Sequence, residues 1–325
     1  MAGVRDRWSG ALIVVAGASL FGMLGTLSRF AYDDGLTPFA WVAWRAAFGA
    51  LALWLAIARR HGLRSSLGVL RGASPAARGW LALVVVSSAV LNLAIFVAFQ
   101  RITIALALLA FYTYPAMTAA MAGLLGHERL DATRRIALGL ALAGMVAVVA
   151  GGLGSGAAVT IDALGIGLAL LAAASQTTFL LASRGYASIR TEEAMGTILL
   201  GAAAIAVVLS AIVDGPAELA RPLGDPGLLA LLIFAGVFVA ALPSFLFLTG
   251  IRLVGPVRAG ILMLFEPVVG VALAAIVLGE GLSPVQAAGG ATILLAAALV
   301  QRRAPAPAAG TPLVETPVAP APGGP

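Results

Sequence analysis

A carboxylate in the middle of an apolar run is the feature of this sequence with the clearest capacity for chemistry. Glu266 lies in the stretch "GILMLFEPVVGVAL", which begins at Gly260, and it is followed at once by Pro267, a helix breaker. Inside a membrane such a group can exchange a proton or contact a substrate directly. It can also pair with an arginine, for which Arg45 is the candidate, or accept hydrogen bonds from backbone N–H groups beside the proline. These readings stay open at the level of sequence.

Arg45 stands out among the cations because it lies within an apolar run. Counted from Trp41, it shares a helical face with Trp44 and Phe48 at spacings of three, four and seven residues. This pattern predicts a cation beside aromatic rings, suited to a substrate carboxylate or ring. The alternative is a structural role, in which Arg45 caps carbonyl groups of a neighbouring helix or reaches a membrane interface.

Other polar or aromatic residues inside apolar runs are candidates for substrate contact: Asn92, Tyr112, Tyr114 and Gln176. Asn92 shares one helical face with Ser88 and two phenylalanines, and Gln176 belongs to the polar cluster "SQTTF". Tyr114 directly precedes Pro115. The alternative for Asn92 is a hydrogen bond between helices, and for the tyrosines ordinary packing.

Motifs typical of enzymes and metal sites are absent from the sequence. The two histidines, His61 and His127, have no metal-ligand spacing, and there is no cysteine. No HExxH, P-loop or GxSxG motif occurs in its required context. We therefore expect no enzyme activity, no metal and no cofactor. The formal charge of +6 does not indicate nucleic-acid binding, because the arginines gather at helix ends rather than on one solvated face.

The elements that must position the candidate residues are transmembrane helices. The chain is 61% hydrophobic and 10% charged, with a mean hydropathy of +1.04, which is too apolar for an ordinary soluble domain. Its apolar runs are about 20 residues long, the length at which a helix crosses a lipid bilayer. The sequence predicts an all-α membrane protein with ten transmembrane helices, at approximately residues 10–30, 39–58, 80–99, 105–125, 135–152, 163–183, 193–213, 227–249, 258–278 and 284–301.

The distribution of arginine predicts the orientation in the membrane. Sixteen arginines fall in one set of alternate connections and three in the other. Arginine is enriched in cytoplasmic loops. Both termini, residues 1–9 and the Pro/Ala/Gly-rich tail 304–325, are therefore expected in the cytoplasm, the tail without fixed structure. The expected location is the cell (inner) membrane.

An internal repeat divides the chain into two halves. The segments "YTYPAMTAAMAGLLGHERL" and "LMLFEPVVGVALAAIVLGEGL" each place a glutamate (Glu128, Glu280) thirteen residues after a proline. The predicted repeats, 10–152 and 162–302, hold five spans each. Because five is odd, the two copies must cross the membrane in opposite orientations. Inverted repeats are typical of transporters that work by alternating access around a site near the midplane.

These segments, with "WVAWRAAFGAL" around Arg45, resemble the EamA group of the drug/metabolite transporter superfamily. The resemblance covers about residues 10–302. It implies a central cavity between helices 1–4 and 6–9. It also implies that helices 5 and 10 lie at the periphery, near which a homodimer contact would form. Relatives move amino acids, purine-type compounds, drugs and quaternary ammonium compounds, so a small-molecule substrate is implied but not its identity.

The predicted function is secondary active transport. The chain is expected to export small organic metabolites, such as amino acids, nucleobase-like compounds or drugs, by rocking one five-helix module against the other. The alternatives are a membrane-embedded enzyme and a non-transporting membrane scaffold. A scaffold does not need inverted halves with polar faces, and an enzyme needs a reactive cluster that the sequence lacks. A channel would need a ring-forming motif, which is also not found.

Overall fold

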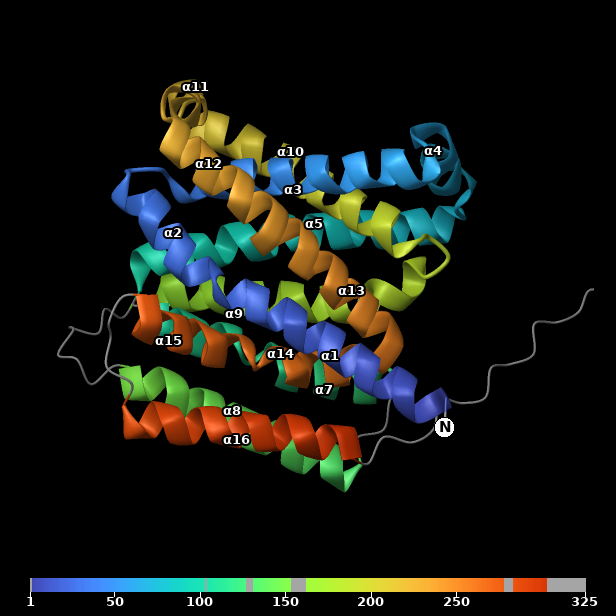
Figure 1. Cartoon of the computed structure of the whole chain (residues 1–325), viewed down its shortest axis with the longest axis vertical. Helices are drawn as coiled ribbons and strands as arrows, with labels where there is room; N and C mark the ends of the chain where they lie inside the picture. The colour runs from blue at the N-terminus through green and yellow to red at the C-terminus, as the bar shows by residue number, and fades with distance from the viewer. Residues whose placement is uncertain (1, 103, 127–130, 153–161, 278–282, 303–325) are drawn as a thin grey trace, which may run out of the picture.

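The computed structural model describes the chain except for residues 1, 103, 127–130, 153–161, 278–282 and 303–325. Among the described residues every regular element is a helix, as predicted (Figure 1). Several residues that the sequence analysis singled out lie outside the described part, namely His127, Glu128, Glu280 and the tail 304–325.

Within the described part of the chain, eight helical segments are long and apolar enough to cross a membrane, so the protein is a multi-pass membrane protein. They are Ser9–Asp33 (α1, Ala2–Gly22, and α2, Leu24–Asp33), Pro38–His61 (α3), Pro75–Arg101 (α5), Leu106–Leu124 (α6, Ile104–Phe111, and α7, Tyr114–Leu124), Ala132–Gly151 (α8, Ala132–Gly152), Ala163–Tyr186 (α9, Ala163–Ala182, and η2, Ser183–Tyr186), Thr191–Val213 (α10) and Pro226–Val254 (α12, Pro226–Phe234, η4, Ala235–Ala241, and α13, Leu242–Val254). Three further apolar helices follow, α14 (Pro256–Met263), α15 (Glu266–Val277) and α16 (Pro284–Arg302). The connections contain α4 (Leu63–Gly72), α11 (Pro216–Ala220) and η3 (Arg221–Gly224).

The helices begin where the sequence supplies a cap followed by proline. Thr37 accepts a hydrogen bond from the Ala40 backbone N–H at 3.2 Å, and Pro38 is the first residue of α3. Ser74 and Pro75 start α5 in the same way. Proline suits the first helical turn because its missing N–H would have had no helical partner there. These local signals explain why the predicted starts of the long helices lie close to the observed ones.

Two transmembrane segments are broken next to a proline. The α6–α7 segment is interrupted at Tyr112 and Thr113, just before Pro115. The α14–α15 segment is interrupted at Leu264 and Phe265, just before Pro267. Proline lacks the N–H that would continue the helical ladder, so each break leaves backbone groups without helical partners at membrane depth.

A third irregularity lies in the Pro226–Val254 segment, where η4 is a π-helix of seven residues. Pro243 is the second residue after η4. It has no backbone N–H, so it cannot donate to the carbonyl of Val239, four residues earlier. The Leu242 N–H bonds to Val237 O, five residues back, which is the π pattern. The sequence predicts a kink at Pro243 and Ser244, and the structure places the irregular turn just before them.

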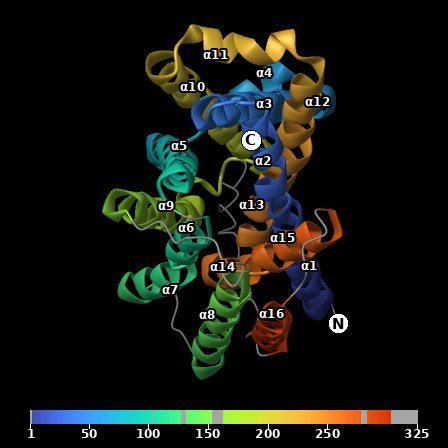
Figure 2. The same cartoon turned by 90° about the vertical axis from the view of Figure 1, so that its left-hand side faces the viewer.

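The helices pack in pairs that connect the two halves of the chain. The most extensive pairs are α8 with α16, α3 with α10, α5 with α9, and α1 with α13. The broken segments also meet, through α7 and α14. Figures 1 and 2 show α8 and α16 together at one edge of the bundle. The N-terminus and α4 lie at one end of the helices and α11 at the opposite end (Figure 1).

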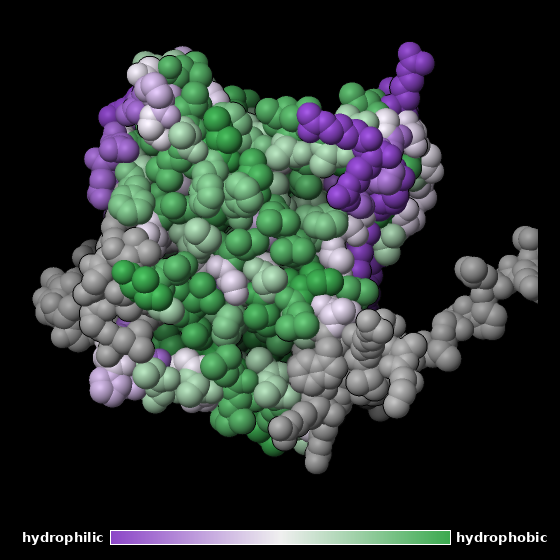
Figure 3. Space-filling model, in the orientation of Figure 1, coloured by the Kyte–Doolittle hydropathy of each residue, from purple (hydrophilic) through white to green (hydrophobic). Residues whose placement is uncertain are grey.

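The outer face of the bundle is apolar. Figure 3 shows one face covered mainly by hydrophobic residues, with hydrophilic residues gathered toward the two ends of the helices. Many large hydrophobic side chains are exposed, among them Leu124, Ile212 and Ile276 at 74–81%. A hydrocarbon environment accounts for this exposure, because in lipid an outward-facing leucine carries no penalty.

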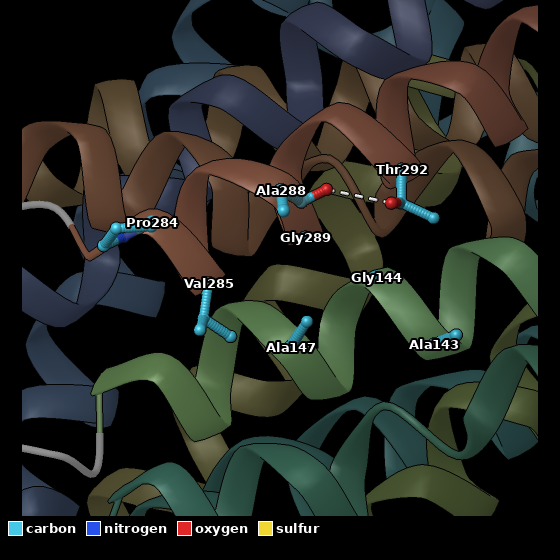
Figure 4. Close-up of a pocket in the computed structure, with 8 residues that line it drawn as sticks. All are labelled: Ala143, Gly144, Ala147, Pro284, Val285, Ala288, Gly289 and Thr292. Atoms are coloured by element: carbon cyan, nitrogen blue, oxygen red, sulfur yellow. Dashed lines mark hydrogen bonds between the residues drawn. The ribbon is translucent and has the colours of Figure 1, made fainter.

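The α8–α16 pair is held together by glycines. Gly144 and Gly289 lie face to face, so that a Cβ on Gly144 would be 2.7 Å from the Gly289 carbonyl oxygen. A Cβ on Gly289 would be 2.6 Å from the Gly144 carbonyl oxygen. Figure 4 shows the shallow groove beside this contact, into which small side chains of both helices project, including Ala147 and Ala288. Small residues allow such close backbone approach between membrane helices.

Gly289→Ala is expected to destabilise the folded protein by about 1–3 kcal/mol, the usual range for overpacking. The reason is that the new methyl group meets backbone, which cannot move aside without separating the helices. The measurement is the thermal unfolding midpoint of the purified protein in detergent. Gly139→Ala on α8 is the matched control, since its Cβ meets nothing within 4 Å. Equal midpoints for the two variants would contradict this account of the pair.

Candidate transport cavity

A cavity of about 900 Å³ lies inside the bundle and is lined by residues from both halves of the chain. Six of the eight predicted site residues line it: Arg45, Asn92, Tyr112, Tyr114, Gln176 and Glu266. At the end of the helices that carries α11, it is lined by polar residues such as Asp33, Thr37 and Gln100. The volume is within the range typical of small-molecule sites.

Arg45 is 5% exposed and bridges three transmembrane segments. Its Nη2 donates to Asn92 Oδ1 of α5 at 2.5 Å, and its Nη1 makes a long hydrogen bond of 3.5 Å to the Val239 carbonyl of η4. Val239 lies four residues before Pro243, which has no N–H to donate to its carbonyl. Arg45 therefore caps a carbonyl group of a neighbouring helix, which is the structural role considered from sequence.

The aromatic environment of Arg45 differs from the prediction. Its guanidinium lies over the ring of Phe96 on α5, 5.8 Å from the centroid, and no such contact with Trp41 or Trp44 is found among the described residues. The predicted tryptophan partners are therefore wrong. The guanidinium extends across to α5 and η4, because the hydrogen-bond acceptors that a buried cation needs lie there.

Trp41 and Trp44 do not line the cavity. Trp41 is fully buried and packs edge-to-face against Tyr32, with ring centroids 6.5 Å apart. The Trp44 indole N–H donates to the Leu219 carbonyl of α11 at 3.0 Å, and its ring stacks on Phe48. The structure thus gives both tryptophans packing contacts with neighbouring elements.

Asn92 uses both ends of its amide within the protein. The oxygen accepts from Arg45, and Nδ2 donates to the Ser88 carbonyl at 2.8 Å. These bonds orient the amide so that its oxygen faces the guanidinium. The interhelical hydrogen bond that the sequence left as an alternative is therefore present, while Asn92 also lines the cavity.

Glu266 is the first residue of α15, directly after the helix break, and it lines the cavity. Its carboxylate lies close enough to Tyr112 and Tyr114 to interact with both. Phe111 completes a cluster with these tyrosines, its ring 5.2–5.3 Å from theirs. Gly22 allows α1 to approach this point, because a Cβ there would lie 2.9 Å from the Glu266 carbonyl oxygen.

Two of the structural readings of Glu266 are not observed. Among the described residues, the ion pairs join Arg101 to Asp162, Arg190 to Glu193 and Arg221 to Glu218. No pair between Arg45 and Glu266 occurs there, and no backbone N–H of the described chain donates to the Glu266 side chain. The carboxylate instead lies at the cavity beside the tyrosines, with Tyr112 as its side-chain hydrogen-bond partner, and proton exchange and substrate contact by Glu266 stay predictions.

The sequence model of the EamA-like transporter family matches residues 8–150 and 163–302. This chain belongs to the EamA-like transporter family. It is thus a membrane transporter of the drug/metabolite transporter superfamily, whose EamA members are transporters rather than enzymes. One solved crystal structure of a protein, 20% identical, matches with a TM-score of 0.73 over 90% of this chain and 97% of that one, a likeness of fold. Comparison with curated proteins gives no match.

Gln176 lies on the cavity side of α9 in this EamA-family protein, as the sequence suggested. Its neighbour Thr177 instead joins helices, accepting from Thr118 at 3.4 Å and donating to the Tyr114 carbonyl at 3.3 Å. Tyr114 is the first residue of α7, so Thr177 ties α9 to the helix that begins just after the α6–α7 break. The cluster "SQTTF" therefore divides between cavity lining and helix packing.

The sequence reasoning missed Tyr32. Its hydroxyl is buried without a hydrogen-bond partner, it lines the cavity, and it interacts with Arg45. A signal for it was available, because the Ser-Arg pairs at 28–29 and 183–184 are each followed within three residues by a tyrosine, Tyr32 and Tyr186. An unpartnered hydroxyl beside a buried guanidinium adds a second donor to the Arg45 side of the cavity.

Proposed function

We propose that this EamA-family protein is a secondary active transporter that exports small organic metabolites by alternating access. The observation that carries the proposal is the cavity, into which both halves of the chain contribute polar and charged side chains. Arg45 has no acidic partner and Glu266 no basic partner among the described residues. Buried charges without counter-charges are costly, so a substrate or proton that compensates them is favoured.

We further propose ten transmembrane helices in two inverted five-helix repeats, over residues 10–152 and 162–302. The helix pairing supports this arrangement. A two-fold operation that exchanges the repeats turns the α1–α13 pair into α9–α5, and it maps the pairs α3–α10, α7–α14 and α8–α16 onto themselves. These are the pairs observed. The irregular α14–α15 segment and the shorter α16 would be the ninth and tenth spans.

The proposed orientation places both termini in the cytoplasm of a cell with an inner membrane. It rests on the arginine distribution, with α4 and its five flanking or included arginines on the cytoplasmic side. In this orientation the polar end of the cavity, near Asp33 and Thr37, faces outward. Energy would come from an ion or substrate gradient.

The test is a tolerance screen of cells that overproduce the protein, grown with a panel of amino acids, nucleobase-like compounds and drugs. Cells are expected to tolerate at least one compound better and to release it unchanged into the medium. An Arg45→Ala variant that is membrane-inserted to the same level provides the background. A chemically altered compound would support the enzyme alternative. Unchanged tolerance across the panel, or faster uptake, would contradict export.

A further inference from the structure

Two stacked phenylalanine rings line the cavity toward the end of the bundle that carries the N-terminus and α4. Phe179 of α9 and Phe247 of α13 are nearly parallel, with an interplanar angle of 6° and ring centroids 6.0 Å apart. Both line the cavity and both are at least nine-tenths buried. On α9 and α13 they are the last lining residues before the cytoplasmic ends of the helices.

A separate polar network lies beyond the rings. Arg252 of α13 donates to Thr191 Oγ1 at 2.9 Å, and its guanidinium lies over the ring of Tyr186, 5.7 Å from the centroid. None of these three residues lines the cavity. Arg252 follows Phe247 by five residues, little more than one helical turn. A thin apolar layer therefore separates the cavity from the polar groups of this network.

The seal depends on side chains rather than on backbone packing. Within the described residues, α9 packs mainly on α5, and α13 mainly on α1, and the α9–α13 pair itself is not extensive. The two rings bridge the space between helices that have separate principal partners. A small displacement of one helix pair relative to the other would part the rings, and it would also have to release the contacts of Arg252 with Tyr186 and Thr191 beyond them.

The matching position at the other end of the cavity has a different lining. When Ser183 is aligned with Ser28 of the first repeat, Phe179 falls on Leu24. Leu24 also lines the cavity, but polar residues such as Asp33 and Gln286 line it there too. The two ends thus differ: the described lining is aromatic and stacked at one end and includes polar side chains at the other, an asymmetry that suits alternating access.

We propose that Phe179 and Phe247 form the cytoplasmic gate of this transporter, closed in the present conformation. The proposal rests on the alternating-access function proposed above and names the side chains that must separate in its inward-open state. Phe179→Ala combined with Phe247→Ala removes the seal while leaving the helices and the cavity-lining polar groups unchanged.

The chain contains no cysteine, so a single introduced thiol reports on access to the cavity. Ser244→Cys is suitable, because Ser244 lines the cavity on α13 within one turn of Phe247. The full-length protein is labelled with a membrane-impermeant maleimide in right-side-out and in inside-out membrane vesicles. With the gate residues intact, labelling is expected mainly from the external side. The double alanine variant is expected to label at least about tenfold faster from the cytoplasmic side.

Phe234→Ala with Phe238→Ala is the matched control. These rings also contact each other, tilted by 34° with centroids 5.0 Å apart, and they lie in the same transmembrane segment, but they are 40–45% exposed. An equal rise in cytoplasmic labelling in the control would overturn the gate, since it would reflect a loosened segment. If the double variant does not fold, Phe247→Ala alone is measured, with a smaller rise in the same direction expected.

The remaining outcomes separate the gate from the function on which it rests. If Ser244→Cys is labelled from both sides but the alanine variants change nothing, alternating access stands and the gate is wrong. Labelling from neither side, or from the cytoplasmic side alone while the gate residues are intact, would contradict the cavity and orientation assumed in the proposed function.

Discussion

Replacing Glu266 by glutamine is expected to abolish gradient-driven export while leaving the protein folded and inserted in the membrane. Glutamine keeps the size and the hydrogen-bonding capacity of the side chain but cannot bind and release a proton. The side chain lines the cavity and has neither an arginine partner nor a backbone donor among the described residues. Loss of the carboxylate is therefore expected to affect proton exchange or substrate binding more than the geometry of the helix break.

The expected loss of flux is at least about tenfold, since a hydrogen bond to a charged group contributes about 1.5–3 kcal/mol and 1.4 kcal/mol corresponds to about tenfold. Flux of a compound identified in the tolerance screen is measured in proteoliposomes with and without a pH gradient. Wild-type flux should respond to the gradient, and the flux of Glu266→Gln should not. Glu192→Gln is the control, because Glu192 is a carboxylate outside the cavity.

Three results would be informative in different ways. An unchanged response to the pH gradient in Glu266→Gln would rule out proton coupling by this residue. A retained response with a weakened apparent affinity would identify Glu266 as a substrate contact. A large fall in the unfolding midpoint with no specific effect on flux would return Glu266 to a structural role.

Arg45→Gln is expected to lower the stability of the folded protein as well as transport. The substitution leaves Asn92 Oδ1 and the Val239 carbonyl without their donor. Each buried polar group left unpaired costs about 1–3 kcal/mol. Arg45→Lys is expected to recover only part of the loss, because an ammonium on a narrow stem cannot donate in a planar fork to acceptors on two helices. Thermal and denaturant unfolding of the purified protein measure both effects.

Pro243→Ala provides an internal test of the same contact. Alanine restores an N–H that can donate to the Val239 carbonyl within its own segment, so the Arg45 bond to that carbonyl becomes redundant. Arg45→Gln should therefore cost less in the Pro243→Ala background than in the natural sequence. Additive losses in this double-mutant cycle would show that the proline and the arginine act independently.

Much of the fold follows from local features of the sequence. Apolar runs of membrane-spanning length, caps such as Thr37 and Ser74, and prolines at helix starts or breaks each act within a few residues. In a hydrocarbon layer the backbone N–H and C=O groups must bond to one another, because no water is there to bond to them. An apolar run of this length therefore forms a helix. The helix positions and the interruptions beside Pro115 and Pro267 were therefore predictable.

The partners of the polar residues depended on the tertiary structure. The sequence pointed to Arg45, but a side chain of this length can reach several helices. Only the packing of those helices decided that its guanidinium meets Asn92, Phe96 and the Val239 carbonyl rather than the tryptophans of its own helix. For Glu266 the sequence left Arg45 as one candidate partner among several readings, and the meeting of the broken segments placed it beside Tyr112.

The sequence by itself determined the helices, their breaks, the repeat and the residues whose burial needs an explanation, because these depend on composition and on neighbours along the chain. Only the tertiary structure decided which helices pair, that Trp41 and Trp44 pack away from the cavity, and that Phe179 meets Phe247. The physical reason is that contacts between helices depend on rotation and depth, and a pattern within one helix leaves both free.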